Sequence, residues 1–376
     1  MRSDRKTESL KILTVANMYP SAADPTYGTF VKNFVDRLNS LNEGGSNRVV
    51  TIYGRRKGVV AKLKAYAGYY LRLTKALLTD SYDLVYIHTI TFPTPALRVA
   101  SLFRRLPMVF NVHGDDVLPS NRFKKMLKAM SRPLLRKSLM IVSPSDYFKG
   151  VVLKEFPDLD ANKIVVSASG GIDRKFFVTR PERPTSGRPI EIGFVSRIDQ
   201  GKGWDIFLNS LAMLRAEKVP FHATIAGRGA QSDAMLKMIT DYQLNDAVDY
   251  IGAVAHDELP TVYASFDLFI FPSTRENESL GLVGLEAMAA GTPVIASNMA
   301  GPAGYVSPGI DGYLFPPADA AALAGEINRF ISLSDDEKSS MRMKSIEKAA
   351  TYESVSVASA LFNRLCRLIK ASKNQF

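Results

Sequence analysis

The stretch FPSTRENESLGLVGLEAMAAGTPVIASN, residues 271–298, decides the fold of this chain. It reads as the end of a buried strand, a polar loop, an apolar helix that stops at Gly291, and a second buried strand. A helix that begins just after the carboxyl end of a strand points unpaired backbone N–H groups outward, which suits an anion. Glu278 lies at the loop end of this helix, and Glu286 follows about two helical turns later. Both carboxylates can therefore face the same side and flank a bound anion.

The alternation of strand and helix extends in both directions from this stretch. It predicts parallel sheets of the doubly wound type. A chain of 376 residues exceeds what one core usually organises, so we expect two domains. The segment TRPERPTSGRP, residues 179–189, is the predicted linker because it is rich in Pro, Gly and Arg. The predicted strands are residues 12–16, 49–53, 84–88, 108–112, 140–143 and 164–167, then 190–195, 222–226, 248–251, 268–271, 294–296 and 312–315.

Composition limits the class of protein. A hydrophobic content of 46% is typical of a globular protein. Cys366 is the only cysteine, which excludes a disulfide within the chain and suits a reducing compartment. The charged start of the sequence is unlike a signal peptide, and no apolar run approaches the length of a membrane-spanning helix. We therefore expect a cytoplasmic protein.

Charge is distributed very unevenly along the chain. Residues 1–180 contain 30 Lys and Arg against 14 Asp and Glu, a net charge of +16, whereas residues 181–376 contain 18 against 23, a net charge of −5. The predicted helices at 57–78 and 122–140 combine Lys and Arg with apolar side chains at helical spacing. This pattern predicts a polyanionic partner, and an anionic membrane or a nucleic acid would fit. The alternative is ordinary domain helices whose basic faces are solvated.

A second motif lies upstream of the opening stretch. Arg197 and Lys202 flank a tight polar turn in FVSRIDQGKGWDIFL, and two cations at such a place can neutralise a diphosphate. The alternative is a solvated basic loop. Further along, ATIAGRG ends a predicted strand at Gly227 and Gly229. Position 232 is serine, which does not continue a dinucleotide fingerprint, so a nicotinamide cofactor is not expected.

Together these motifs resemble family 4 of the retaining glycosyltransferases, which have the GT-B fold. The resemblance rests on Glu278 and Glu286 within SLGLVGLEAMAAGTPVIAS, and on the cation and glycine motifs just described. It is clearest from about residue 190 to residue 315 and weaker in the N-terminal half. Leu280 departs from the family pattern, because relatives usually have phenylalanine there.

The resemblance implies an α/β architecture of two Rossmann-like domains that face each other across a cleft. Residues 1–182 would form an acceptor-binding N-terminal domain, and residues 357–376 would form a helix that crosses back onto it. Residues 183–356 would form the domain that binds a nucleotide sugar. The donor-binding residues that the resemblance implies are Gly28, Arg197, Lys202, Gly227, Val254, Ser279, Leu280, Gly281 and Glu286.

The resemblance also implies a role for each charged residue of this site. Arg197 and Lys202 would neutralise the leaving diphosphate, and Glu286 would accept hydrogen bonds from a ribose diol. Glu278 would contact hydroxyls of the transferred sugar. A nucleophilic Glu278, as in the two-carboxylate glycosidases, is the alternative that we do not favour. Glu276 competes for the same role, but the residue at the corresponding spacing is glycine, so the register selects Glu278.

His113 is the expected catalytic residue of the N-terminal half. It follows the predicted strand 108–112 in FNVHGDDV, and open α/β sheets bind ligands at the carboxyl ends of their strands. The resemblance implies that His113 contacts the donor sugar; a structural histidine is the alternative. Asp115 and Asp116 follow, but no His, Asp or Glu cluster has the spacing of metal ligands, so no metal is expected.

The sequence thus predicts a retaining glycosyltransferase. It would move a hexose-type sugar from a nucleotide-sugar donor, with UDP or GDP as the nucleotide, to a glycan or lipid-linked acceptor in surface polysaccharide or glycolipid synthesis. No separate cofactor is expected, and no nucleic-acid partner, because the basic half lacks a recognisable module. Its place would be peripheral, on the inner face of the cell membrane. The alternatives are a non-catalytic nucleotide-sugar-binding partner subunit and a GT-B nucleotide-sugar epimerase.

Overall fold

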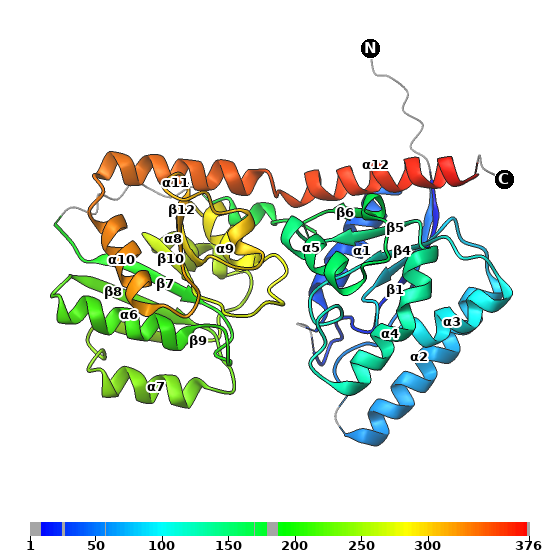
Figure 1. Ribbon diagram of the computed structural model, residues 1–376, viewed down its shortest axis with the longest axis horizontal. Coiled ribbons are helices and arrows are strands. Elements are labelled where there is room, and N and C mark those ends of the chain that lie inside the picture. Colours follow the sequence, from blue (N-terminus) through cyan, green and yellow to red (C-terminus); the bar gives the residue numbers. More distant parts are fainter. Residues whose placement is uncertain (1–8, 25–26, 57, 169, 179–186, 374–376) are drawn as a thin grey trace, which may run out of the picture. The chain divides into compact units, whose positions relative to one another are not determined.

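The chain divides into two compact α/β units (Figure 1). The computed structural model describes residues 9–24, 27–56, 58–168, 170–178 and 187–373, so the predicted linker lies largely outside the described residues. The N-terminal unit comprises Met1–Gly170 and Val355–Phe376, and the C-terminal unit comprises Gly171–Ser354. The C-terminal unit therefore begins earlier than the sequence-based boundary at residue 183.

The sheet of the N-terminal unit is parallel and is covered on both faces. In β3, Val85 and Ile87 join one hydrophobic cluster, whereas Leu84 and Tyr86 join another, because successive side chains point to opposite faces. Burial on both faces explains why these strands read as continuous apolar runs. The strands, in spatial order, are β2 (Ser46–Val50), β1 (Lys11–Val15), β3 (Leu84–His88), β4 (Met108–Asn111), β5 (Met140–Ser143) and β6 (Ile164–Val166).

Different helices cover the two faces of this sheet. The cluster that contains Val85 also takes side chains from α2 (Val59–Thr79), α3 (Thr94–Phe103), α4 (Arg122–Lys137) and α5 (Asp146–Glu155). The cluster that contains Leu84 takes side chains from α1 (Thr29–Leu41) and α12 (Ser354–Lys373). The last helix, red in Figure 1, thus packs on the first sheet of the chain.

The C-terminal unit repeats this architecture. Its parallel strands, in spatial order, are β12 (Gly312–Phe315), β11 (Val294–Ser297), β10 (Leu268–Phe271), β7 (Ile190–Val195), β8 (Phe221–Ala226) and β9 (Val248–Gly252). One large hydrophobic cluster joins this sheet to α6 (Trp204–Ala216), α7 (Ser232–Asp241) and α10 (Ala320–Ile331). The remaining helices pack in sequence on one another: α8 (Leu259–Ser265), α9 (Leu282–Ala289) and α11 (Asp335–Ala350).

Each sheet has one point where the order of the strands reverses. In the N-terminal unit this point lies between β1 and β3, and in the C-terminal unit it lies between β7 and β10. Open parallel sheets bind ligands outside the carboxyl ends of the strands at such a switch point. The loops that follow these four strands are therefore where a site is expected in each unit.

The predicted α/β fold of two doubly wound sheets is confirmed, and a strand is present at each predicted place. Within the part of the chain that the structure describes, no helix combines the length and apolar character needed to cross a membrane.

Candidate functional site

At the switch point of the C-terminal unit, a lysine and a glutamate meet. Lys202 lies in the loop between β7 and α6, and Glu278 lies in the loop between β10 and α9. Lys202 Nζ is 2.5 Å from Glu278 Oε2, and the two side chains are only 14% and 18% exposed. Coulombic attraction strengthens where water is partly excluded, so this pair holds the lysine in place. An anion that arrives here can replace Glu278 as the partner of Lys202.

Backbone contacts fix the two loops relative to each other. The N–H of Thr274 donates to the carbonyl of Gly201 at 2.9 Å, and Arg275 Nη2 donates to the carbonyl of Gln200 at 2.6 Å. Gly203 has a φ of 80°, and a Cβ there would lie 2.0 Å from the carbonyl oxygen of Pro272. Only glycine fits this close approach, so the glycine beside Lys202 helps to set the position of the ion pair.

Arg197 lies in the loop after β7, and Gly227 lies in the loop after β8. Arg197 Nη1 is 2.9 Å from Asp199 Oδ2, and its side chain is 67% exposed, so it is a solvated cation beside the buried pair. Gly227 follows β8, and a Cβ there would lie 1.8 Å from the carbonyl oxygen of Ser196. Gly227 thus allows the loop after β8 to pack against the loop after β7.

The start of α9 is the place where the sequence predicts an anion site. Gly281 caps the helix with a φ of 80°, and its carbonyl accepts a hydrogen bond from Tyr305 Oη at 3.0 Å. The first N–H groups of a helix have no partner within it, which makes this end favourable for a phosphate. Ser279 and Leu280 precede the cap, and the Leu280 side chain is buried.

Glu286 lies further along α9 and contacts Tyr263 and His256 rather than Lys202. Tyr263 Oη donates to Glu286 Oε2 at 3.1 Å, and His256 Nε2 is 4.0 Å from Oε1. Burial raises the pKa of Glu286 to about 7, although the Tyr263 hydrogen bond and the charge of Lys175 oppose this rise. The carboxyl therefore titrates near neutral pH.

Lys175 and His256 form the outer part of this set. Lys175 Nζ lies 2.7 Å from His256 Nδ1 and 2.5 Å from Asp257 Oδ1. Burial, followed by the charge of Lys175, lowers the pKa of His256. Val254 lies in the same loop after β9 and is partly buried. The C-terminal unit thus gathers cations around both carboxylates of the opening motif.

In the N-terminal unit, His113 lies at the carboxyl end of β4 against a second histidine. His113 Nε2 is 3.2 Å from His88 Nδ1, and the two rings stack at 9°. Asp116 accepts hydrogen bonds from the N–H groups of His113 and Gly114, both at 3.0 Å. Burial lowers the pKa of His113 to about 4 and raises that of Asp116 to about 6. His113 is therefore neutral at physiological pH.

Gly28 belongs to the same end of the sheet. It caps α1 with a φ of 74°, and a Cβ there would lie 2.8 Å from the backbone of Met18, which follows β1. Phe30, near the start of that helix, meets the His113 ring edge-on with centroids 4.8 Å apart. Gly28 thus allows α1 to start close to the chain after β1, beside the histidine pair.

Sequence reasoning missed the partners of these residues. His88 ends β3, and its Nε2 is buried without a partner among the described residues. His256 and Lys175 surround Glu286 in the other unit. A usable signal existed: the chain has only four histidines, and His88 lies at the carboxyl end of a predicted strand, where His113 was considered. The described residues contain no group of three or more His, Cys, Asp or Glu that could hold a metal ion.

Comparisons of sequence agree with the motifs. The family described as Glycosyl transferases group 1 matches residues 177–350, and that described as Glycosyltransferase Family 4 matches residues 33–173. Glycogen synthase of Mycobacterium tuberculosis is 29% identical over 279 residues, which cover 72% of this chain and 65% of that protein. The colanic acid biosynthesis glycosyltransferase WcaL of Salmonella typhimurium is 30% identical over 242 residues, or 63% of this chain and 58% of WcaL. The chain therefore spans less than two thirds of either relative.

Comparisons of structure show the same fold. HepE of Anabaena, solved in complex with UDP, superposes with a TM-score of 0.74 at 19% identity, and the match covers 95% of this chain and all of that chain. A glycosyltransferase from Rickettsia africae gives a TM-score of 0.74 at 18% identity, with 96% and 99% covered. Two Rossmann-like units of this kind define the GT-B class. The chain belongs to glycosyltransferase family 4, which both family matches support.

Proposed function

We propose that this chain is a retaining glycosyltransferase that moves a hexose-type sugar from a nucleotide-sugar donor to a glycan or lipid-linked acceptor. The observation that carries the proposal is the ion pair of Lys202 and Glu278 at the switch point between β7 and β10. A largely buried lysine beside a helix start would offer a diphosphate both a charge partner and backbone donors.

Different residues of the site would bind the diphosphate, the ribose and the sugar of the donor. Lys202 and Arg197 would stabilise charge that develops on the leaving diphosphate, which is often the largest single contribution to catalysis. Glu286 would accept the ribose hydroxyls, and Glu278, once released by Lys202, would accept hydroxyls of the sugar. The neutral imidazole of His113 can donate or accept a hydrogen bond at a sugar hydroxyl.

The nucleotide and the stereochemistry are further parts of the proposal. HepE was solved with UDP and with UDP-glucose, so UDP-sugars are the first donors to test and GDP-sugars the second. Retention would follow if the leaving phosphate accepts the proton of the acceptor on the same face of the sugar. Because Lys202 and Arg197 would supply two positive charges to the diphosphate, we expect transfer to need no metal ion and to survive a chelator.

A donor screen followed by product analysis tests this function. Thermal unfolding with UDP-, GDP- and ADP-sugars should show one nucleotide that raises the melting temperature, because a ligand well above its Kd stabilises by a few kcal/mol. NMR of the product should then show the donor's anomeric configuration. Donor binding without turnover over a range of acceptors would favour a non-catalytic partner subunit. Release of an epimerised sugar would favour an epimerase.

The surface formed by α2, α3 and α4 supports a second proposal, contact with an anionic membrane. These helices lie side by side on one face of the N-terminal sheet (Figure 1). Each presents exposed apolar side chains, such as Leu71 at 73%, Leu102 at 80% and Phe123 at 55%. Lys62 and Lys64 of α2 are also exposed. Basic helices with exposed apolar groups bind anionic lipid, so we propose a peripheral place at the membrane.

Ion pairs reduce the number of cations on α4 that are available to bind an anionic membrane. Lys128 pairs with Glu155, and Arg132 and Arg136 share Asp158, so two carboxylates balance part of the positive charge of α4. The apolar side chains therefore become the more direct test of membrane contact.

A further inference from the structure

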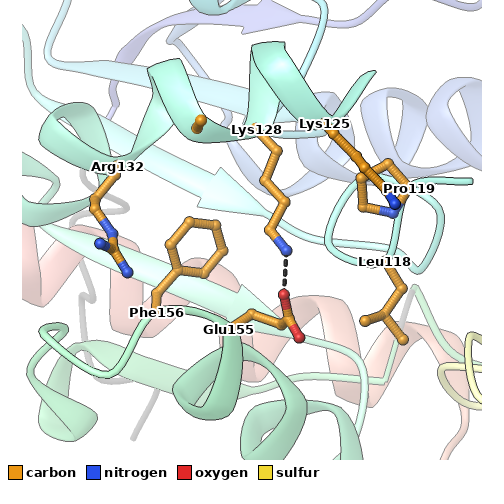
Figure 2. A pocket seen from close by; sticks show the side chains of 8 residues that line it. Leu118, Pro119, Lys125, Lys128, Arg132, Glu155 and Phe156 are labelled. Carbon is orange, nitrogen blue, oxygen red and sulfur yellow. Dashed lines mark hydrogen bonds and ion pairs between the residues drawn. The ribbon is translucent and has the colours of Figure 1, made fainter. Parts of the chain in front are cut away.

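A pocket of about 620 Å³ lies between α4 and the end of α5 in the N-terminal unit (Figure 2). Its volume is in the range of small-molecule sites. Three cations reach it from α4, and the loop after β4, which also carries His113, closes one side with two apolar residues. The lining residues are Leu118, Pro119, Lys125, Lys128, Ala129, Arg132, Glu155 and Phe156.

The charges around this pocket do not cancel. Glu155 pairs with Lys128, and Asp158 is shared by Arg132 and Arg136. Lys125 has no ion-pair partner among the described residues, so four cations face two carboxylates. The excess of two positive charges matches a phosphate monoester, which carries a charge of about −1.5 to −2 at pH 7.

The cations are also positioned in advance. Phe156 is 2% exposed, and its ring lies under Lys128 Nζ at 5.3 Å and under the Arg132 guanidinium at 6.0 Å. Figure 2 shows Lys128 turned from α4 towards Glu155, with the Phe156 ring between Lys128 and Arg132. The Lys128 side chain is only 15% exposed. A cation fixed in this way loses little freedom when it binds an anion.

An ordinary network of surface ion pairs would explain the contacts of Lys128 and Arg132 separately. It does not explain why they line a cavity together with Leu118, Pro119 and Phe156. Nor does it explain why Lys125, which has no ion-pair partner among the described residues, lines the same cavity. Polar anchors within a mostly apolar cavity are typical of ligand sites.

We propose that this pocket binds a phosphate monoester. The phosphate would lie between Lys125, Lys128 and Arg132, and the adjoining carbon chain would lie against Leu118 and Phe156. In the bound state the phosphate replaces Glu155 as the partner of Lys128. The site lies within the N-terminal unit and is distinct from the pair of Lys202 and Glu278, so it does not rest on the proposed function.

Two probes distinguish the sources of such a phosphate. Titration of the full chain with glycerol 3-phosphate, followed by ³¹P NMR, tests a soluble ester. Sedimentation with phosphatidic acid vesicles, compared with phosphatidylglycerol vesicles of matched surface charge, tests a lipid headgroup, because phosphatidylglycerol is anionic but carries a phosphodiester. Lys128→Gln should weaken binding of the effective probe by about tenfold or more, because a hydrogen bond to a charged group is lost. Lys137→Gln, an exposed cation on the same helix outside the pocket, should leave binding unchanged.

Glu155→Gln gives the sharper test because its expected effect has the opposite sign. Loss of the competing carboxylate frees Lys128, so binding of the same probe should become several-fold tighter. Circular dichroism checks folding, and Asp158→Asn, which frees Arg132 and Arg136, replaces Glu155→Gln if that variant unfolds. The proposal is overturned if neither probe binds, if Lys128→Gln and Lys137→Gln bind alike, or if the carboxylate variant binds no more tightly than the unmodified chain.

Discussion

At the residue scale, Lys202 and Glu278 form an ion pair, and in the proposed function Lys202 would exchange Glu278 for the diphosphate. The lysine is mostly buried, so it needs an anionic partner before the donor arrives. Glu278 is that partner, and it can turn to the sugar once a diphosphate occupies Lys202. In the proposed function, this ion pair would couple donor binding to the release of a carboxylate.

Glu278→Gln tests this coupling. The variant leaves Lys202 without its carboxylate, so its free energy of unfolding should fall by about 1–3 kcal/mol. A bound nucleoside diphosphate supplies the missing charge, so the ligand should raise the melting temperature more in the variant than in the unmodified chain. Thermal unfolding with and without the nucleotide measures both effects. An equal or smaller ligand effect in the variant would contradict the exchange of partners.

Glu286 gives a prediction about pH. Its pKa in the folded chain, about 7, lies above the value of about 4.5 in the unfolded chain. Its stabilising contribution is therefore fully present below pH 4.5 and is lost as pH rises through 7. Relative to Glu286→Gln, the unmodified chain should lose on the order of 3 kcal/mol across this range. Urea unfolding at a series of pH values measures the difference, and a difference independent of pH would show that the pKa is not raised.

Site residues could be predicted where their spacing along the sequence matches a known motif. The spacing of Glu278 and Glu286, and that of Arg197 and Lys202, is visible in the sequence itself. The partners of these residues were not visible, because Tyr263 and Lys175 reach Glu286 only through the packing of the C-terminal unit. The roles assigned to the site residues stay predictions.

At the scale of elements, the loops after β7 and β10 form one rigid junction. A Cβ at Gly203 would collide with the carbonyl oxygen of Pro272, and the positive φ of Gly203 disfavours any residue with a side chain. Because contacts between these loops position Lys202 and Glu278, a change in the backbone at Gly203 should move both side chains.

A pair of glycine substitutions tests the junction. Gly203→Ala would place a Cβ 2.0 Å from a backbone oxygen, so it should destabilise the fold by about 1–3 kcal/mol and weaken binding of a nucleoside diphosphate. Gly325→Ala, on an exposed turn of α10 where a Cβ meets nothing within 4 Å, should stabilise by about 0.5–1 kcal/mol. Thermal unfolding and calorimetric titration compare them. Equal behaviour of the two variants would refute the importance of the junction.

The elements themselves were largely predictable from the sequence. Strands buried on both faces appear as short apolar runs, which is why β3, β5, β10 and β12 were located to the residue. The largest error is β2, predicted at 49–53 and observed at Ser46–Val50. It is an edge strand with a polar first half, and its register is set by pairing with β1, which a local pattern does not reveal.

At the scale of the whole molecule, the excess of positive charge in the first half coincides with exposed apolar side chains on α2, α3 and α4. The sequence revealed the charge but not how much of it is neutralised, because the ion pairs of α4 depend on tertiary contacts. The contact between His88 and His113 also depends on which strands are neighbours, although the place of His88 at the end of a predicted strand was a usable signal.

Vesicle binding tests the proposed membrane surface. We expect the full chain to sediment with anionic vesicles, and high salt to release it, because each Lys or Arg near such a surface contributes about 1 kcal/mol that salt screens. Leu102→Ser combined with Phe103→Ser should weaken this binding. Met343→Ser, a change of an exposed apolar side chain in the C-terminal unit (53% exposed), should not. Equal sedimentation with neutral vesicles would rule out the electrostatic account.

The most direct measurement of the central claim is calorimetric titration of a nucleoside diphosphate into three forms of the full chain. UDP, GDP and ADP are tried first on the unmodified chain to find the ligand. Lys202→Ala should then bind that ligand at least tenfold more weakly, because it lacks the buried cation that would pair with the diphosphate. Lys237→Ala, which removes an exposed lysine of α7 paired with Asp241, should bind it as the unmodified chain does. Equal affinity of Lys202→Ala and Lys237→Ala would contradict the claim that the switch point between β7 and β10 holds the donor.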